Sequence, residues 1–355
     1  MLVNTLPKLR PAADFSHGEI RGGRRRSNGG VDLKTSEFGS ELSSESVFPA
    51  IVQRTLSSAV RCAGIGLHSG EAIAMAIGPA EPGAGIVLHR TDIANGGAYI
   101  PLNWRHIVDS RLATTVGNDY GITVSTVEHL MAALAGCQID NAIVEVDGPE
   151  LPIMDGSARP FVAMIEQAGT RTQDAPRRLI RIDKRVVVGD HEKSLSLTPA
   201  GAFSLSFEID FDSSSLARQK LAIHMGDGAF KSDIAGARTF GFAHEVDHLR
   251  SLGLALGGSL DNAIVIDGDR VLNEEGLRFQ DEFVRHKILD CIGDLYLAGA
   301  PIIGHVHGAR SGHGLNHALL RALFDDDEAW SYVVPGTEHD PRPARPGLDA
   351  DVIRP

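Results

Sequence analysis

The sequence contains little cysteine and no long apolar run. Its 355 residues include only three cysteines, Cys62, Cys137 and Cys291, and no two of them form a CxxC pair. This spacing offers no disulfide framework and is typical of a reducing compartment, so we expect a cytoplasmic protein. Because no run of roughly 18 apolar residues is present, we also expect no membrane-spanning helix and no stable membrane anchor.

Positive charge is also scarce. The chain has 46 Asp and Glu residues against 34 Lys and Arg residues, which gives a net charge of −12. A negative surface repels phosphate backbones, so we expect no nucleic-acid partner. The hydrophobic share of 43% is typical of a globular protein. The length is sufficient for about two domains.

Both ends of the chain lack apolar periodicity. Residues 1–47 contain RGGRRRSNGG and SELSSES, which predict a disordered extension. Residues 335–355 are rich in proline, which predicts a loose tail. Between them, strand-like runs alternate with a few helices, and this order predicts an α+β fold. A break in the apolar pattern near residues 169–178 separates a first domain, 48–172, from a second, 178–334.

Hydrophobic periodicity predicts five helices in this central region. They cover residues 126–134, 158–167, 244–252, 282–297 and 315–324. Two of them, one in each half of the chain, carry most of the polar chemistry.

The first of these two helices, VSTVEHLMAALAG, contains Glu128 beside His129. Ser125 followed three residues later by Glu128 is a capping-box pattern, so one interpretation makes Glu128 a helix cap. In the other, the His129 imidazole binds a metal and the Glu128 carboxylate acts on water beside it. This motif alone leaves both interpretations open. Gly136 is placed to end the helix.

The second helix, DEFVRHKILDCIGDLYLAG, places His286, Asp290 and Asp294 at i, i+4 and i+8 on one stripe. Side chains four residues apart on a helix lie ~5–6 Å apart, so His286 and Asp290 can hold one ion. The alternative is a solvated acidic face with a His–Asp pair. Gly293 interrupts the apolar stripe although glycine costs ~1 kcal/mol there relative to alanine, so we expect another backbone to approach closely.

Together, His129, His286 and Asp290 offer two nitrogens and one oxygen. Catalytic zinc sites take three such ligands and keep a fourth position open, so the set predicts one Zn²⁺ as cofactor. Glu128 would then be the general base. Asp294, one turn beyond Asp290, suits the orientation of a histidine.

Two glycine-containing segments add candidates. GARSGHGLNHALL places His313 in a loop before a helix that begins near Asn316. There it could act as a general acid, or it could be a capping or surface residue. GARTFGF places Thr239 beside Phe240. Thr239 could donate a hydrogen bond to an oxyanion, or it could belong to a turn.

A competing motif is HEVDH at residues 244–248, which matches the HExxH pattern of zinc metalloproteases. Its helix is amphipathic, whereas the protease helix is buried. Ser251 also stands where the longer pattern of that class needs glycine. We interpret the match as accidental. A second alternative, a non-catalytic sugar-nucleotide-binding protein, would lack the metal set.

Five motifs stand in order along the chain: TVEHLMAALAG, PELPIMDGSARPFV, ARTFGF, LNEEGLRFQDEFVRHKILDCIGDLYLAG and SGHGLN. The set resembles the zinc-dependent UDP-3-O-acyl-N-acetylglucosamine deacetylases of lipid A synthesis, from about residue 51 to about residue 334. The resemblance implies two related α+β domains, each a sheet layered against helices, with the active site at their interface. It also implies hydrolysis of an acylated UDP-sugar to the free amine and acetate, the committed step of lipid A synthesis. We expect a monomer.

The resemblance also implies roles for residues at matching positions. His129, His286 and Asp290 would hold the zinc, and Glu128 would be the base. His313 would be the cationic group that stabilises the oxyanion and protonates the departing amine. Asp294 would orient His313, and Thr239 would face the oxyanion.

Further matching positions concern the substrate. Lys287 would contact the sugar nucleotide, with Phe240 as a second substrate-binding candidate. Phe211 matches the end of the family's uridine-side strand. An insert at residues 240–267 would form an apolar passage for the acyl chain, which puts HEVDH on the helix of that insert.

Overall fold

The computed structural model describes residues 51–94, 97–211, 218–226 and 228–336. By their contacts, all of these residues belong to one unit, residues 46–355. The extension predicted at residues 1–47 lies outside the described residues. So does the predicted tail, apart from residues 335–336, which form a turn.

Two five-stranded sheets supply the framework. The first consists of β2 (Val60–Ile65), β3 (Ala72–Pro79), β4 (Ile86–Arg90), β5 (Tyr99–Pro101) and β9 (Ala142–Val146). The second consists of β12 (Val186–Gly189), β13 (Ser194–Thr198), β14 (Ser204–Ile209), β15 (Gln219–His224) and β20 (His305–Ala309). In β14, Leu205, Phe207 and Ile209 are buried and alternate with polar residues, as expected for a sheet with one face on the core.

The two sheets repeat one pattern of strand pairing. Their orders are β2-β3-β9-β4-β5 and β12-β13-β20-β14-β15. In each sheet the third and fourth strands of this order pair in parallel, and every other pair is antiparallel. The fold is therefore α+β, as predicted, and the two halves of the chain share a topology.

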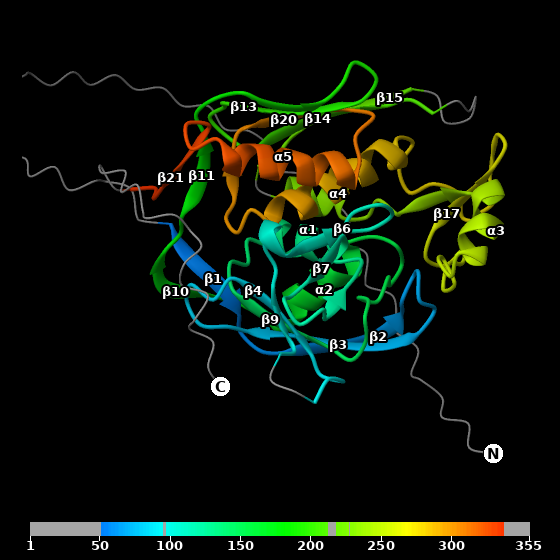
Figure 1. Ribbon diagram of the computed structural model, residues 1–355, viewed down its shortest axis with the longest axis horizontal. Coiled ribbons are helices and arrows are strands. Elements are labelled where there is room, and N and C mark those ends of the chain that lie inside the picture. The colour runs from blue at the N-terminus through cyan, green and yellow to red at the C-terminus, as the bar shows by residue number, and fades with distance from the viewer. Residues whose placement is uncertain (1–50, 95–96, 212–217, 227, 337–355) are drawn as a thin grey trace, which may run out of the picture. The chain divides into compact units, whose positions relative to one another are not determined.

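Helices from both halves meet between the sheets (Figure 1). They are α1 (Glu128–Gly136), α2 (Arg159–Ala168), α4 (Glu282–Tyr296) and α5 (His313–Asp325), whereas α3 (Ala243–Ser251) lies at the side, away from this group. α2 packs on the first sheet and on α1, whereas α4 and α5 pack on the second sheet. α1 and α4 pack directly against each other. The five predicted helices are confirmed, and α1 ends at Gly136 as expected. No helix among the described residues is both long and apolar enough to cross a bilayer.

The two halves differ in the chain segment that precedes the helix carrying the candidate ligands, which is α1 in the first half and α4 in the second. The first half has the short helix η1 (Trp104–His106) and strands β6 (Ile107–Asp109), β7 (Thr115–Gly117) and β8 (Thr123–Val124). The second half has the π-helix η2 (Phe230–Ile234), β16 (Phe240–Phe242), α3, β17 (Ile264–Asp267) and β18 (Arg270–Val271). β16 and β17 pair in parallel with α3 between them, so residues 240–267 do form a β-α-β element.

The segment between the halves is a strand. β10 (Thr170–Pro176) pairs antiparallel with β1 (Val52–Leu56), although its sequence was interpreted as a break. Only Gln173 of β10 is buried, so the strand lacks the apolar alternation that would have revealed it. Two residues separate β10 from the next strand, β11 (Leu179–Ile182). This strand pairs with β19 (Ile302–Ile303) and β21 (Trp330–Val333). The domain boundaries at 172 and 178 stay a prediction.

The backbones of α1 and α4 approach each other closely at Gly293. A Cβ atom added there would lie 2.0 Å from the carbonyl oxygen of Glu128 and 3.1 Å from the backbone nitrogen of Ala132. The expected close approach of another backbone is therefore confirmed. Glycine at this position lets the polar residues of both helices reach a common point.

Candidate metal centre and active site

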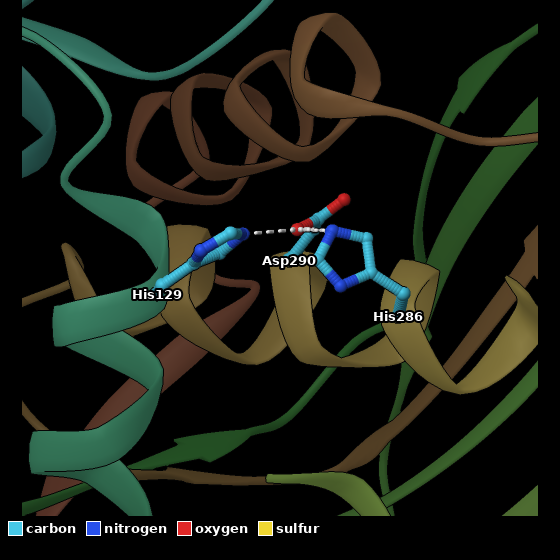
Figure 2. Close-up of side chains that lie close together, drawn as sticks. All are labelled: His129, His286 and Asp290. Carbon is cyan, nitrogen blue, oxygen red and sulfur yellow. Dashed lines mark ion pairs between the residues drawn. The ribbon is translucent and has the colours of Figure 1, made fainter. Parts of the chain in front are cut away.

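Three potential ligand atoms converge where α1 meets α4. Figure 2 shows the His129 ring, from α1, and the His286 ring, from α4, turned toward the Asp290 carboxylate. The ligand atoms lie within 4.8 Å of one another, and all three residues are buried. Asp290 Oδ1 is 3.2 Å from His286 Nε2 and 3.7 Å from His129 Nε2. Over the described ranges, this is the one group of three such residues that converges in this way.

The donor set fits a divalent cation. Asp290 Oδ2 accepts a hydrogen bond from Lys287 Nζ at 2.6 Å, whereas the buried Oδ1 has no hydrogen-bond partner among the described residues. His286 Nδ1 lies 3.1 Å from the carbonyl oxygen of Ala237 and donates to it, which leaves the Nε2 lone pair facing Asp290. An unpaired buried acceptor is costly. A cation held by both imidazoles would satisfy it.

Electrostatics hold these groups in the protonation states that bind metal. Burial lowers the pKa of His286 to about 3 although Asp290 opposes the shift, so the imidazole is neutral. Burial disfavours the Asp290 carboxylate, but the charge of Lys287, which donates to Oδ2, holds its pKa well below the usual range. Neutral imidazole and ionised carboxylate are the forms that coordinate a cation.

Glu128 lies beside this group as the first residue of α1. Its Oε2 accepts a hydrogen bond from the backbone N–H of Thr114 at 3.1 Å, and its Oε1 lies 3.7 Å from His313 Nε2. Burial raises the pKa of the Glu128 carboxyl, while His313 and His129 oppose the shift. A raised carboxyl pKa suits a general base.

The capping-box interpretation of Glu128 is wrong. The residue before α1 is Val127, and it makes no side-chain cap. Because Glu128 is the first helical residue rather than the third, its carboxylate cannot reach back to cap the Ser125 position. The Ser125 hydroxyl instead contacts Thr115 Oγ1 at 2.9 Å.

His313 is the first residue of α5, whereas the sequence predicted a loop before a helix near Asn316. Gly312 precedes it and has no side chain to mark the start of the helix. His313 Nδ1 lies 2.7 Å from Asp294 Oδ2. Burial lowers the pKa of His313, but the charge and hydrogen bond of Asp294 outweigh it and raise the pKa to about 9. The site therefore holds an imidazolium whose Nε2 faces Glu128.

Two neighbouring cavities meet at the converging ligands. A cavity of about 480 Å³ is lined by the three converging residues together with Glu128, Thr239 and Lys287. A second, of about 380 Å³, shares Thr239 and Lys287 and is also lined by Phe211 and Phe240. The Phe211 and Phe240 rings meet edge to face, with centroids 5.7 Å apart. Asp294 is fully buried behind His313 and lines neither cavity.

A family model for UDP-3-O-acyl N-acetylglycosamine deacetylase matches residues 53–325 of the chain. The chain belongs to this deacetylase family. The UDP-3-O-acyl-N-acetylglucosamine deacetylase of Phenylobacterium zucineum (strain HLK1) is 51% identical over 278 residues, which cover 78% of this chain and 95% of the relative. That of Acidithiobacillus ferrooxidans (strain ATCC 53993 / BNL-5-31) is 52% identical over 285 residues, 80% of this chain and 93% of the relative. That of Vibrio cholerae serotype O1 (strain M66-2) is 49% identical over 286 residues, again 80% and 93%.

Membership in the deacetylase family confirms the resemblance drawn from the five motifs, and the competing HEVDH motif lies on the surface. His244 and His248 lie on α3, and both are exposed. Neither joins a converging group of three ligands within the described parts of the chain. The motif therefore has the solvated character that its sequence predicted.

Some residues around this candidate site were not predicted from the sequence. Thr114 contacts both halves: its backbone donates to Glu128, and its hydroxyl lies 2.5 Å from Asp294 Oδ1. His317 Nε2 lies 3.2 Å from the same Asp294 oxygen. The four-residue spacing of His313 and His317 was a signal for His317, but nothing in SRLATTVG marks Thr114.

His68 was also missed. It lines the larger cavity, and both of its ring nitrogens are buried without a hydrogen-bond partner among the described residues. Its loop is held by Glu150, which accepts hydrogen bonds from the backbone of His68 and Ser69 at 2.9 Å each. The signal was the glycine-flanked sequence GLHSG, in which a histidine stands in a turn.

Proposed function

We propose that this protein hydrolyses the N-acetyl group of UDP-3-O-(3-hydroxyacyl)-N-acetylglucosamine to acetate and the free amine, a step of lipid A biosynthesis. We assign one Zn²⁺ as its cofactor, with His129, His286 and Asp290 as ligands. The observation that carries the proposal is the convergence of these three donors beside the buried Glu128 carboxylate. It occurs in a chain that is 51% identical to one such deacetylase.

Glu128 serves the first step beside the proposed metal site. A zinc ion held by the three donors would polarise the acetyl carbonyl and lower the pKa of a neighbouring water. Glu128 takes a proton from the attacking water. The N–H of Thr114 holds one Glu128 oxygen, so the other oxygen is left to receive that proton.

His313 and Thr239 serve the second step. His313 stabilises the oxyanion by its charge and then transfers its Nε2 proton to the departing nitrogen as the C–N bond breaks, which yields the neutral amine and acetic acid. The acid loses its proton to solvent as acetate, and the proton held by Glu128 returns to His313 Nε2, 3.7 Å from Glu128 Oε1. The hydrogen bond between His313 Nδ1 and Asp294 fixes the ring so that Nε2 faces the reacting atoms. Thr239, at the wall shared by the two cavities, donates its hydroxyl proton to the oxyanion.

The two cavities suit the two ends of an acylated UDP-sugar. We assign Lys287 to the sugar nucleotide, and Phe211 with Phe240 to substrate contact in the smaller cavity. We assign the acyl chain to the element at residues 240–267, where Leu252 and Leu256 are exposed. We further propose a monomer in the cytoplasm, which agrees with three free cysteines.

The proposal is tested by acetate release from UDP-3-O-acyl-N-acetylglucosamine before chelation, after chelation and after zinc is restored. We expect activity to disappear with the metal and to return with zinc. The exposed-histidine variant His244→Ala is the control and should follow the unchanged protein through all three states. No turnover in any state would favour the sugar-nucleotide-binding alternative. Activity lost in His244→Ala would favour the protease motif.

A further inference from the structure

Asp294 lies at the centre of a buried hydrogen-bond network. It is fully buried, and its Oδ2 accepts from His313 Nδ1 at 2.7 Å and from Asn316 Nδ2 at 2.8 Å. Its Oδ1 accepts from Thr114 Oγ1 at 2.5 Å and lies 3.2 Å from His317 Nε2. Each carboxylate oxygen therefore has two polar partners, and the mechanism above uses only His313.

The second imidazole, His317, lies one helical turn after His313 on α5 and is 2% exposed. Its Nε2 is 3.1 Å from Thr114 Oγ1, and its buried Nδ1 has no partner among the described residues. The single hydroxyl proton of Thr114 is used in the contact to Asp294. His317 must therefore donate from Nε2, and Nδ1 is the bare nitrogen.

We infer that His317 is a positioning residue for the deacetylation: with Thr114 it holds Asp294 Oδ1, so that Oδ2 stays directed at His313. The inference rests on the proposed function, because it acts through the group assigned as the proton donor to the amine. His317 touches neither cavity and thus contacts no substrate.

The geometry explains why one more donor matters. The plane of a carboxylate is held more firmly when each oxygen has two polar partners than when one oxygen has a single partner. Without His317, Oδ2 keeps His313 and Asn316, but Oδ1 keeps only the Thr114 hydroxyl, so the carboxylate plane can tilt. The His313 ring turns with that plane, because its Nδ1 follows Oδ2. Its Nε2 would then leave the position 3.7 Å from Glu128 Oε1 that faces the reacting atoms.

The test compares His317→Leu, which removes the donor, with His317→Gln, whose amide can still donate to Asp294. His307→Gln, on an exposed strand position, is the control. We expect His317→Leu to lower kcat by about tenfold, the lower end for loss of an orienting partner. KM and bound zinc should stay unchanged. His317→Gln should recover most of kcat, and His307→Gln should match the unchanged protein.

A double mutant separates positioning from a general structural role. In a His313→Ala background, His317→Leu should cause no further loss of kcat, because the group through which it acts is gone. An equal loss in both backgrounds would overturn the inference, as would unchanged kcat in His317→Leu alone. If His317→Leu does not fold, His317→Met takes its place in both comparisons. If the protein without any substitution releases no acetate, the proposed function is refuted rather than this inference.

Discussion

The two helices that meet at the metal centre both begin with a buried glutamate, yet the two carboxylates are used differently. Glu282, at the start of α4, accepts from the backbone N–H and the Nε of Arg238 and from the N–H of Arg278. Glu128, at the start of α1, accepts one backbone hydrogen bond, and its second oxygen faces the cavity. A carboxylate whose acceptors are all occupied stabilises the fold. A carboxylate with one oxygen that accepts no hydrogen bond can receive a proton there.

The same contrast extends to the halves that carry these helices. Both use one sheet topology, but the first half supplies one proposed ligand and the proposed base, whereas the second supplies two proposed ligands and the His313–Asp294 pair. The shared framework sets where the helices lie. The chemistry depends on a few side chains that the halves do not share.

The sharpest test of this division removes one ligand from each half. His129→Ala and Asp290→Ala should both abolish zinc retention and activity, because neither half alone offers three donors. Bound zinc after dialysis, measured by atomic absorption, checks this. Full occupancy in Asp290→Ala would show that the ligand set is misread. Full occupancy in His129→Ala alone would place the site within the second half.

The next largest effect should come from Glu128→Ala. Loss of a general base lowers the rate by ~10²–10⁴, so kcat should fall over this span while zinc stays bound. Stability should change by about 1 kcal/mol or less, since only one hydrogen bond is lost. Acetate release together with denaturant unfolding measures both. A rate loss below about threefold would remove Glu128 from this role.

Glu282→Ala should show the opposite pattern. It leaves Arg238, which is 2% exposed, without its buried partner. Breaking a buried pair from one side costs about 3–5 kcal/mol of unfolding free energy. The control is Glu275→Ala, which removes the exposed partner of the same arginine and should cost about 1 kcal/mol or less. Equal losses of unfolding free energy in Glu282→Ala and Glu275→Ala would contradict the stabilising role given to Glu282.

The smallest predicted effect concerns the contact between the helices. Gly293→Ala places a methyl group against the Glu128 carbonyl, and such overpacking costs about 1–3 kcal/mol. Because the helices must separate to fit it, zinc affinity should fall as well. Gly201→Ala, where a Cβ meets nothing within 4 Å, is the control and should be neutral. Unchanged zinc affinity in Gly293→Ala would mean that the ligand spacing does not depend on this contact.

The sequence was informative where local periodicity or a motif carried the signal. It predicted the five helices, the α+β class and the close approach at Gly293. Its local patterns did not reveal the repeated sheet topology, because strand order depends on contacts distant in sequence; the two related domains were implied only by the resemblance to the deacetylase family. The strand β10 was missed because it buries only Gln173, so its pattern is polar.

The residues of the candidate site likewise include some with a local signal in the sequence and some without one. The HxxxD spacing of His286 and Asp290 and the EH pair at Glu128 and His129 could be read from the helices that carry them. Thr114 could not, because its importance comes from a contact to Asp294 180 positions away. A threonine in a short strand connection has no local feature that indicates such a partner.

The strand β10 also bears on how freely the two halves can move. Enzymes built from two halves often open and close about a flexible hinge. Here β10 pairs with β1 at both of its ends, and the Arg177 that follows it donates to the half-buried Asp140 at 2.7 Å. These contacts tie the connecting segment to the first half of the chain. The three converging donors are thus brought together by the packing of the fold itself, without the help of an ion.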